Sequence, residues 1–527
     1  MITGFAVVAP FFLLGILAGH DFQFHITSWM EVVNQWKQGI LYPRWAALAH
    51  FGYGEARFIF YPPASWVLGA ALGMVLPWKL VPGAYVWLVL TLSGYSMFLL
   101  ARRWLDRRDA IFAAALYAAN PYYLVIVYWR SAFAELLAGA LLPLLLLFVL
   151  RAEEKGSRAA ICLGLIVAAA WLTNAPAAVL VNYSLGLLIV VVAVTRRSPR
   201  VLLVGAAAVP LGAALAAFYI LPATYEQGWI NISPLFAPGM RPQDNFLFTT
   251  IDNAGHDAFN RLLTMTALSE IAVLAVATAF ARRWRQKQRE AFWALLTWAG
   301  AATLLMFSVT SIFWNHLPKL RFLQFPWRWL LCLNVVFALL VAMAWRHKLA
   351  RWVVCVAMLA VLVFGAVRIQ RPWKETAIDI AEREDNVRKG RGYDGPTDYV
   401  PAGADTNEIK QDAEPVAVEG DGKVEIHVQE WDAESRVFTA NVSLPGNLVL
   451  RLFNYPAWRV EVNGRLVESK TREITGKMII PVEAGENRVR VAFARTWDRT
   501  VGGMISAGTV LALVCGTIFR RRHPNRD

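Results

Sequence analysis

The sequence is poor in charged residues and in cysteine. Only 17% of its 527 residues are Asp, Glu, Lys or Arg, whereas 57% are hydrophobic. Soluble proteins usually have about 25% charged and 45–50% apolar residues, so a soluble globular chain is excluded. The four cysteines all lie inside apolar runs, without the CxxC spacing of a metal site. This excludes a disulfide-stapled fold and a zinc module.

Common nucleotide and protease motifs are also missing. No P-loop, GxGxxG, HExxH or GxSxG element stands where a strand followed by a helix would support it. This argues against an ATP-driven transporter, a soluble type of nucleotide-sugar enzyme and a membrane metalloprotease. Acidic residues are fewer than basic ones, and the net charge is +14. Because the basic residues form short clusters between apolar runs, they indicate membrane topology rather than a nucleic-acid partner.

Long apolar runs are abundant, and twelve of them approach the roughly 20 residues that cross a bilayer. The run 66–76 is shorter and ends at Pro77, which predicts an interfacial or re-entrant segment. Asn174, Ala175 and Pro176 predict a tight hairpin between two runs. The expected spans are 2–19, 82–101, 109–127, 134–150, 159–174, 175–195, 200–221, 263–281, 290–309, 328–345, 351–368 and 501–519.

If 66–76 does not span, the clusters rich in Lys and Arg all fall on one side of the membrane. The positive-inside rule makes that side cytoplasmic, including the C-terminal tail, and predicts a multi-pass protein of the plasma (inner) membrane. Residues 1–19 lack a positive n-region and a cleavage site, so we expect a retained first span. The clusters lie at 102–108, 151–158, 196–200, 282–289, 345–351 and 520–526.

Region 369–500 changes character, because charged residues become frequent and short stretches alternate with period two. Asn463-Gly464 predicts a hairpin turn, and Ala484-Gly485 predicts another. We expect an extended lead-in over 374–415 and then a small antiparallel β-sandwich on the extracytoplasmic side. The predicted organisation is a transmembrane domain at 1–368 with an outer loop at 20–81, the mostly β domain at 369–500, and a final span with a basic tail at 501–527.

The outer loop begins with an amphipathic pattern. Apolar residues recur at three- and four-residue steps, and Gly39 provides a stop. This predicts a helix that lies flat on the bilayer surface. The apolar face consists of Phe22, Ile26, Trp29, Met30, Val33, Trp36 and Ile40.

Several motifs carry a resemblance to known families. A first group of motifs, up to residue 328, resembles the bacterial membrane family labelled "6-pyruvoyl-tetrahydropterin synthase related". A second group, near the C-terminus, resembles the YfhO-like membrane family. The first group is Asp21-x3-His25, Gly39, Tyr42-Pro43-Arg44-Trp45, Phe51-Gly52-Tyr53-Gly54, Phe60-Tyr61-Pro62-Pro63, Trp129-Arg130-Ser131-x3-Glu135 and Phe325-Pro326-Trp327-Arg328. The second group is Tyr455-Pro456-x-Trp458, Asn463-Gly464 and Gly502-x3-Ser506.

Both families resemble the GT-C glycosyltransferase superfamily, which implies a polytopic α-helical fold of about twelve spans. The resemblance implies a membrane glycosyltransferase of the cell envelope. Its donor would be a polyprenyl-phosphate sugar, and its acceptor a glycan, lipid or protein on the outer face. Asp21 matches, by position, the acidic residue that follows the first span in that superfamily. The β domain would guide the acceptor.

Sugar transfer requires a base near the acceptor hydroxyl, and Asp21 is the candidate. The alternative is that Asp21 merely caps the surface helix. His25 lies one turn on, where it could orient Asp21 or help bind a divalent metal, or have no role. Glu135 begins an apolar run, which places it inside the bundle, and an ionisable residue at such depth in a membrane protein is a functional candidate. Its alternative is a structural pair with Arg130 or Arg328. No cofactor is certain.

Arginines near the outer interface are candidates to hold the donor phosphate, because cations are disfavoured on that side. For any single one, snorkelling or pairing with a carboxylate is the alternative. His256 lies in a segment that could close over the acceptor, or could be a solvated loop. The arginines are Arg44, Arg57, Arg130, Arg321 and Arg328.

Two other classes of function stay open. A transporter or flippase of lipid-linked sugars would have polar residues inside its spans and broken helices. A non-enzymatic membrane scaffold with a glycan-binding β domain would tolerate loss of Asp21.

Overall fold

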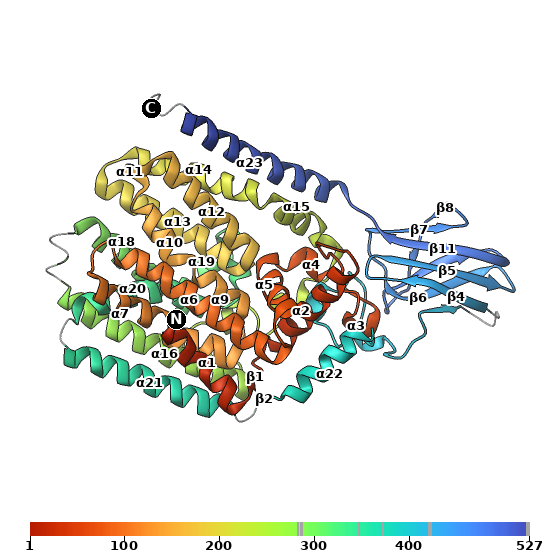
Figure 1. The fold of residues 1–527 in the computed structure, drawn as a ribbon, viewed down its shortest axis with the longest axis horizontal. Coiled ribbons are helices and arrows are strands. Elements are labelled where there is room, and N and C mark those ends of the chain that lie inside the picture. The colour runs from red at the N-terminus through yellow and green to blue at the C-terminus, as the bar shows by residue number, and fades with distance from the viewer. Residues whose placement is uncertain (282–283, 285–287, 346–347, 371–373, 420–423, 523–527) are drawn as a thin grey trace.

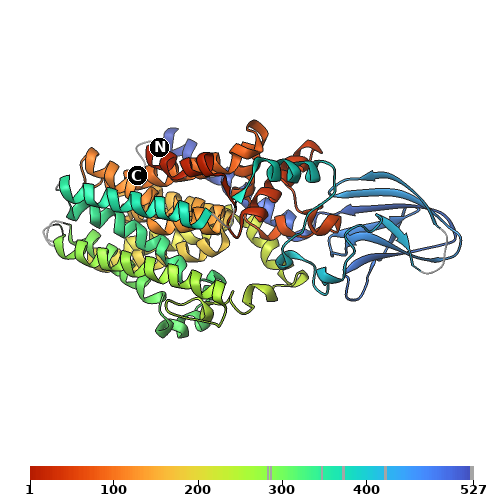
Figure 2. The same ribbon diagram turned by 90° about the horizontal axis from the view of Figure 1, so that it is seen from below.

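The computed structural model describes residues 1–527 except 282–283, 285–287, 346–347, 371–373, 420–423 and 523–527. A bundle of helices makes up most of the molecule, and two β-sheets extend from one end of it (Figures 1 and 2). Parts of the basic clusters at 282–289, 345–351 and 520–526 lie outside the described residues. The chain is an integral multi-pass membrane protein.

Among the described residues, seven helical stretches are long and apolar enough to cross a membrane, or up to nine if two bent pairs each count as one span. The bent pairs are α14 (Pro199–Leu215) with α15 (Ala217–Tyr225), at 75°, and α18 (Arg289–Leu305) with α19 (Ser311–His316), at 93°. The seven are built from α6 (Val81–Ala101), α7 (Arg107–Ala118) with α8 (Pro121–Val125), α13 (Ala175–Arg196), α16 (Ala254–Phe280), α20 (Leu330–Ala344), α21 (Lys348–Gln370) and α23 (Trp497–Arg522).

The described residues thus hold fewer helices of spanning length than the twelve spans we expected. Three expected spans are shorter apolar helices: α1 (Ile2–Leu14), the pair α9 (Phe133–Gly139) and α10 (Leu142–Val149), and α12 (Ser157–Thr173). Gly15 ends α1 with φ of 105°. The short run at 66–76 forms α5 (Pro63–Val75), which is also below spanning length.

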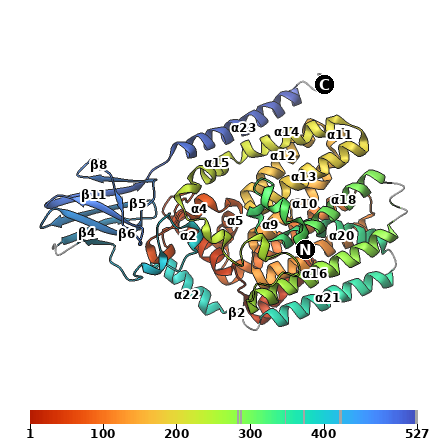
Figure 3. The ribbon, with the colours of Figure 1, turned by 180° about the vertical axis from the view of Figure 1, so that it is seen from behind.

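The hairpin between α12 and α13 is confirmed. Asn174 is the N-cap of α13, and its side chain accepts a hydrogen bond from the backbone N–H of Ala177 at 2.9 Å. α23 runs beside α14 and α15 (Figure 3), and the Ser506 hydroxyl accepts from the Phe218 N–H at 3.0 Å. The short helices α3 (Ala49–Gly52), α4 (Arg57–Phe60) and α11 (Ala152–Lys155) complete the bundle.

The predicted antiparallel β structure is present as two sheets. They share one core, which includes Phe438, Leu450, Ile480 and Val489. Trp45 and Tyr53 of the first loop belong to the same core, so the sheets are packed onto the bundle. One sheet has the order β3 (Val416–Val418), β6 (Gly446–Phe453), β10 (Lys477–Val482), β9 (Lys470–Thr471); the other has β4 (Val424–Trp431), β5 (Ser435–Val442), β11 (Gly485–Phe493), β7 (Trp458–Val462), β8 (Arg465–Val467).

Asn463-Gly464 forms the predicted hairpin between β7 and β8, with both residues at positive φ (52° and 77°) as a type I′ turn requires. The second predicted hairpin, at Ala484-Gly485, is wrong. That turn joins β10 of one sheet to β11 of the other, because Gly485 pairs with Val442 of β5.

The extended lead-in predicted at 374–415 contains a helix that we did not expect, α22 (Ala377–Arg388). Its start is a capping box, in which the side chains of Thr376 and Asp379 bond each other's backbone N–H groups. Just before it, β2 (Lys374–Glu375) pairs with β1 (Ile16–Leu17), which holds the residues after α1.

The predicted helix at the start of the first loop is α2 (Phe22–Lys37), and its apolar residues Ile26 and Trp29 are fully buried. Glu31 and Gln35 on the polar side of α2 are buried as well, so that side does not face solvent, and the flat orientation on a bilayer stays a prediction. Residues 44–57 and Tyr393 cover that side. α2 is thus an internal helix between the bundle and the sheets.

Candidate active site

The chain between α1 and α2 is fixed against the end of another span. The N–H groups of His20 and Asp21 donate to the carbonyls of Trp129 and Arg130, at 3.2 and 2.8 Å. The N–H of Gly19 donates to the Ser131 hydroxyl at 2.9 Å. A Cβ at Gly19 would lie 2.4 Å from the Trp129 carbonyl oxygen, so this approach requires glycine. Asp21 is therefore placed by its backbone.

The facing segment has an irregular backbone. After α8 the helix widens into a π-helical turn, η2 (Ile126–Arg130), and Ser131 then takes a left-handed conformation with φ of 51°. The chain turns into α9, which carries Glu135. Single π turns inside helices are frequent at functional sites. Here the turn brings Arg130 and Glu135 within contact of each other.

Glu135 is the centre of a buried ion cluster. Arg130 Nη1 lies 2.6 Å and Arg328 Nε 3.1 Å from Glu135 Oε2, while the Tyr122 hydroxyl donates to Oε1. The Glu135 side chain is 2% exposed, so its carboxylate is fully compensated and closed to solvent. Arg328 also donates to the Leu323 carbonyl at 2.6 Å. Glu135 thus holds two guanidiniums in place.

Asp21 lies on the open side of this cluster. Its Oδ2 is 4.0 Å from Arg130 Nη2, and its side chain is 45% exposed. Asp21 occupies the N-cap position of α2, but within the described residues its side chain makes no capping hydrogen bond. Desolvation by surrounding protein raises the pKa of Asp21, and Arg130 and Arg328 oppose that rise. The result is an accessible carboxylate beside a fixed guanidinium.

Aromatic rings cover the guanidiniums. Phe325 and Trp327 are stacked with centroids 4.7 Å apart. The guanidinium of Arg130 lies 4.8 Å from the Trp327 ring, and that of Arg328 lies 4.7 Å from the Phe325 ring. Such contacts favour a cation and restrict its orientation.

The ring of His25 lies outside the ion cluster around Glu135. It is 2% exposed and lies among the rings of Phe24, Tyr61 and Phe133, at 5.2–5.9 Å. Burial lowers the pKa of His25 to about 3, and Arg57 and Arg130 lower it too, so the ring is neutral. Among the residues that the structure describes, no group of three or more His, Cys, Asp or Glu side chains could hold a metal.

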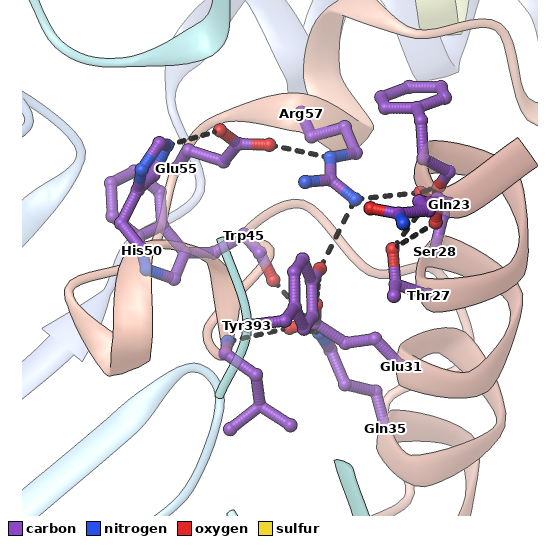
Figure 4. A network of polar contacts seen from close by, with 12 residues as sticks. Gln23, Thr27, Ser28, Glu31, Gln35, Trp45, His50, Glu55, Arg57 and Tyr393 are labelled. Atoms are coloured by element: carbon purple, nitrogen blue, oxygen red, sulfur yellow. Dashed lines mark hydrogen bonds and ion pairs between the residues drawn. The ribbon is translucent and has the colours of Figure 1, made fainter. Parts of the chain in front are cut away.

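Arg57 belongs to a second, separate network on the polar side of α2 (Figure 4). Its Nε lies 2.5 Å from Glu55 Oε1, and its Nη1 donates to the Ser28 and Tyr393 hydroxyls at 2.7 and 3.1 Å. The other oxygen of Glu55 lies 2.9 Å from the ring of His50. Arg57 is fully buried, which favours the structural alternative for this residue.

Three predicted residues lie elsewhere. Arg44 packs over the Tyr42 ring at 4.3 Å. Arg321 is exposed and lies over the rings of Phe236 and Phe322. His256 lies in the first turn of α16 rather than in the expected loop, and its ring contacts Asp257 and Asn245, each at 3.3 Å. Of the predicted residues, the structure brings together Asp21, Arg130, Glu135 and Arg328.

Sequence reasoning missed some polar residues. Tyr122 gave no signal beyond a tyrosine in an apolar run. Glu270 of α16 is 1% exposed, and neither carboxylate oxygen has a side-chain partner in the described part of the chain; the backbone of Tyr122 faces it. Asn334 of α20 is fully buried with its amide unpaired among the same residues. Glu270 could have been found from the sequence, because an acidic residue inside an apolar run is a functional candidate.

A family model described as "6-pyruvoyl-tetrahydropterin synthase related domain; membrane protein" matches residues 58–373, more than half of the chain. This confirms the resemblance to that family. No curated protein matches the chain.

Solved structures of two enzymes are distantly similar. The crystal structure of ArnT from Cupriavidus metallidurans bound to undecaprenyl phosphate has 14% identity and a TM-score of 0.45, over 74% of this chain and 74% of that chain. The archaeal oligosaccharyltransferase AglB from Archaeoglobus fulgidus, in complex with an inhibitory peptide and a dolichol-phosphate, has 14% identity and a TM-score of 0.41. That match covers 75% of this chain and 56% of the archaeal one.

Proposed function

Since the chain belongs to the 6-pyruvoyl-tetrahydropterin synthase related family of membrane proteins, we propose a function from its own side chains. It is a membrane glycosyltransferase that moves a sugar from a polyprenyl-phosphate donor to an acceptor on the outer face of the membrane. The acceptor is a glycan, a lipid or a protein.

One observation carries this proposal: a half-exposed carboxylate stands 4.0 Å from a guanidinium that a buried glutamate holds in place. A hydroxyl is a poor nucleophile, so sugar transfer needs a base, and Asp21 is accessible to accept the proton. The leaving phosphate needs cationic donors, which Arg130 and Arg328 provide. Base and cation must lie on one site, and these residues do.

Glu135 has a supporting part in this mechanism. Its carboxylate accepts from Arg130, Arg328 and Tyr122 and is only 2% exposed, so a substrate proton does not reach it. It positions the guanidiniums and neutralises them while the donor is absent. His25 acts through packing α2 against α9, because a neutral, buried ring does not exchange a proton at neutral pH.

The test is transfer by the purified full chain with a panel of radiolabelled polyprenyl-phosphate sugars. Asp21→Asn should lower transfer by about 10²–10⁴-fold, the usual contribution of a positioned base. Asp412→Asn is the matched control, because Asp412 is exposed and remote in sequence from the site. Wild-type rates in Asp21→Asn would remove Asp21 as the base.

A second candidate function is a transporter or flippase of lipid-linked sugars. Glu270 and Asn334 favour it, because unpaired polar groups inside spans commonly mark transport pathways. The two bent helix pairs also favour it, because such proteins use broken helices.

Proteoliposomes separate the two candidates. If the wild type moves a fluorescent polyprenyl-phosphate sugar between leaflets, transfers none to any acceptor, and loses this movement in Glu270→Gln, the transporter is correct. Transfer that survives Glu270→Gln and fails in Asp21→Asn supports the glycosyltransferase.

A further inference from the structure

A polar cavity lies where the first loop meets the β-sheets. It has a volume of about 300 Å³. It opens near the C-terminal half of α2, whereas Asp21 stands at the other end, roughly 20 Å away along the helix axis at 1.5 Å per residue. The lining residues that matter here are Gln35, Arg388, Lys389, Trp431, Arg436 and Arg451.

Arg436 is an unusually buried cation. It is 2% exposed, its Nη1 donates to the Ser435 carbonyl at 2.9 Å, and its Nε has no partner among the described residues. The rings of Trp431 and Trp458 lie 5.0 and 5.8 Å from the guanidinium. No carboxylate in the described part of the chain forms an ion pair with it. A guanidinium offers five donors, so most of this one's capacity is unused.

Arg451 adds a second cation to the same cavity. Its side chain crosses Gly52, whose Cβ, if present, would lie 3.4 Å from Arg451 Nε. Arg451 Nη1 donates to the Ala413 carbonyl at 2.9 Å, and its Nε is unpaired within the described residues. Burial lowers the pKa of the Arg436 guanidinium; Asp432 opposes this and Arg451 adds to it. The two like charges therefore share a poorly solvated space.

The other charges around the cavity are already engaged or exposed. Glu31 accepts from the Tyr393 hydroxyl at 2.5 Å and from the Leu48 N–H at 2.9 Å. Arg388 and Lys389 both bind Asp385, at 2.8 Å each. Asp432 is exposed. An excess of positive charge remains at Arg436 and Arg451.

The cavity also offers an unused acceptor. Gln35 is 1% exposed; its Nε2 donates to the Trp45 carbonyl at 2.8 Å, but its Oε1 has no partner among the described residues. Two underused guanidiniums and a free amide oxygen in one cavity fit a ligand that carries both an anion and a hydroxyl.

We propose that this cavity binds an anionic saccharide, a sugar that carries a phosphate or a carboxylate group. The anion pairs with Arg436 and Arg451, which offsets the cost of burying them. A sugar hydroxyl donates to Gln35 Oε1. A volume of about 300 Å³ is at the lower end of small-ligand sites, which suits one or two sugar rings.

The test is calorimetric titration of the full chain in detergent with four probes: glucose 6-phosphate, glucuronate, glucose and inorganic phosphate. Saturable binding of glucose 6-phosphate or glucuronate is expected, and the stronger of the two identifies the anion. Glucose should bind at least about tenfold more weakly, because charged hydrogen bonds contribute that much. Inorganic phosphate that binds as tightly as either sugar, or no saturable binding of both, overturns the proposal.

Variants locate the site. Arg451→Gln should weaken binding about tenfold or more, while Arg490→Gln, an exposed arginine on β11, removes the same charge and should change nothing. Equal losses in the two variants would mean non-specific charge attraction and overturn the site. Arg436→Gln can unfold the sheets, so Arg451→Gln is the decisive variant. Asp21→Asn should bind normally, which separates this proposal from the transfer reaction.

Discussion

Two ion clusters meet α2, and they differ in how completely they are closed. Along its side, Glu55 and Arg57 are both fully buried, and Glu55 uses both oxygens, on Arg57 and His50. At its start, Glu135 is likewise buried and paired, but Asp21 remains 45% exposed beside Arg130. The same residue types therefore serve packing where the carboxylate and the guanidinium are both closed to solvent, and become available for chemistry where one carboxylate stays open.

The largest effect on stability should come from breaking the closed network, the buried cluster of Glu55, Arg57 and His50. Arg57→Met leaves the Glu55 carboxylate buried without its cation, which should destabilise the protein by about 3–5 kcal/mol. Denaturation of the purified chain, followed by circular dichroism, measures this. Asp21→Asn should change stability far less, because its side chain caps nothing among the described residues. Similar losses in the two variants would erase the difference between the clusters.

The open cluster should respond to pH. Desolvation raises the pKa of Asp21 above its ordinary value of 3.8, although Arg130 and Arg328 oppose the shift. A base works in its ionised form, so transfer should fall as pH falls through this raised pKa, about tenfold per pH unit below it. The acidic limb of the kcat/KM profile should therefore lie above 3.8. A limb at or below the ordinary value would contradict the proposed environment of Asp21.

The smallest expected effect concerns α22, the helix that precedes Tyr393 in the chain. α22 leads the chain toward Tyr393, and Thr376 starts it with a capping box. Thr376→Ala should cost about 1 kcal/mol, because one side-chain cap is lost. Hydrogen exchange of residues 377–388 should rise while sugar transfer stays unchanged. Exchange equal to that of the wild type would show that packing alone forms this helix.

Much of the fold could be predicted from local patterns. Apolar runs located the longer spans, Asn174 located a hairpin, and Asn463-Gly464 located a turn, because each depends on neighbours in sequence. The turn at Gly485 was mistaken for a hairpin because its backbone chemistry is the same whether the next strand stays in one sheet or changes sheets.

The candidate site was only partly predictable. Arg130 and Glu135 are five residues apart, so their pairing was a reasonable alternative from sequence, and the structure has it. Arg57 looked like an interfacial cation, because its contacts with Ser28 and Tyr393 come from distant segments and only Glu55 is near it in sequence. Burial of the polar side of α2 depends on such distant contacts, which a helical period cannot reveal.

The pairing of Ile16–Leu17 with Lys374–Glu375 has a consequence for assembly. These two short strands come from opposite ends of the bundle's sequence, so the ribosome must deliver most of the polypeptide before they can meet. Non-local pairings of this kind form slowly. The chain after α1 is therefore fixed in two stages: Gly19, His20 and Asp21 bond residues 129–131, whereas Ile16 and Leu17 gain their partners only once Lys374 and Glu375 have been made.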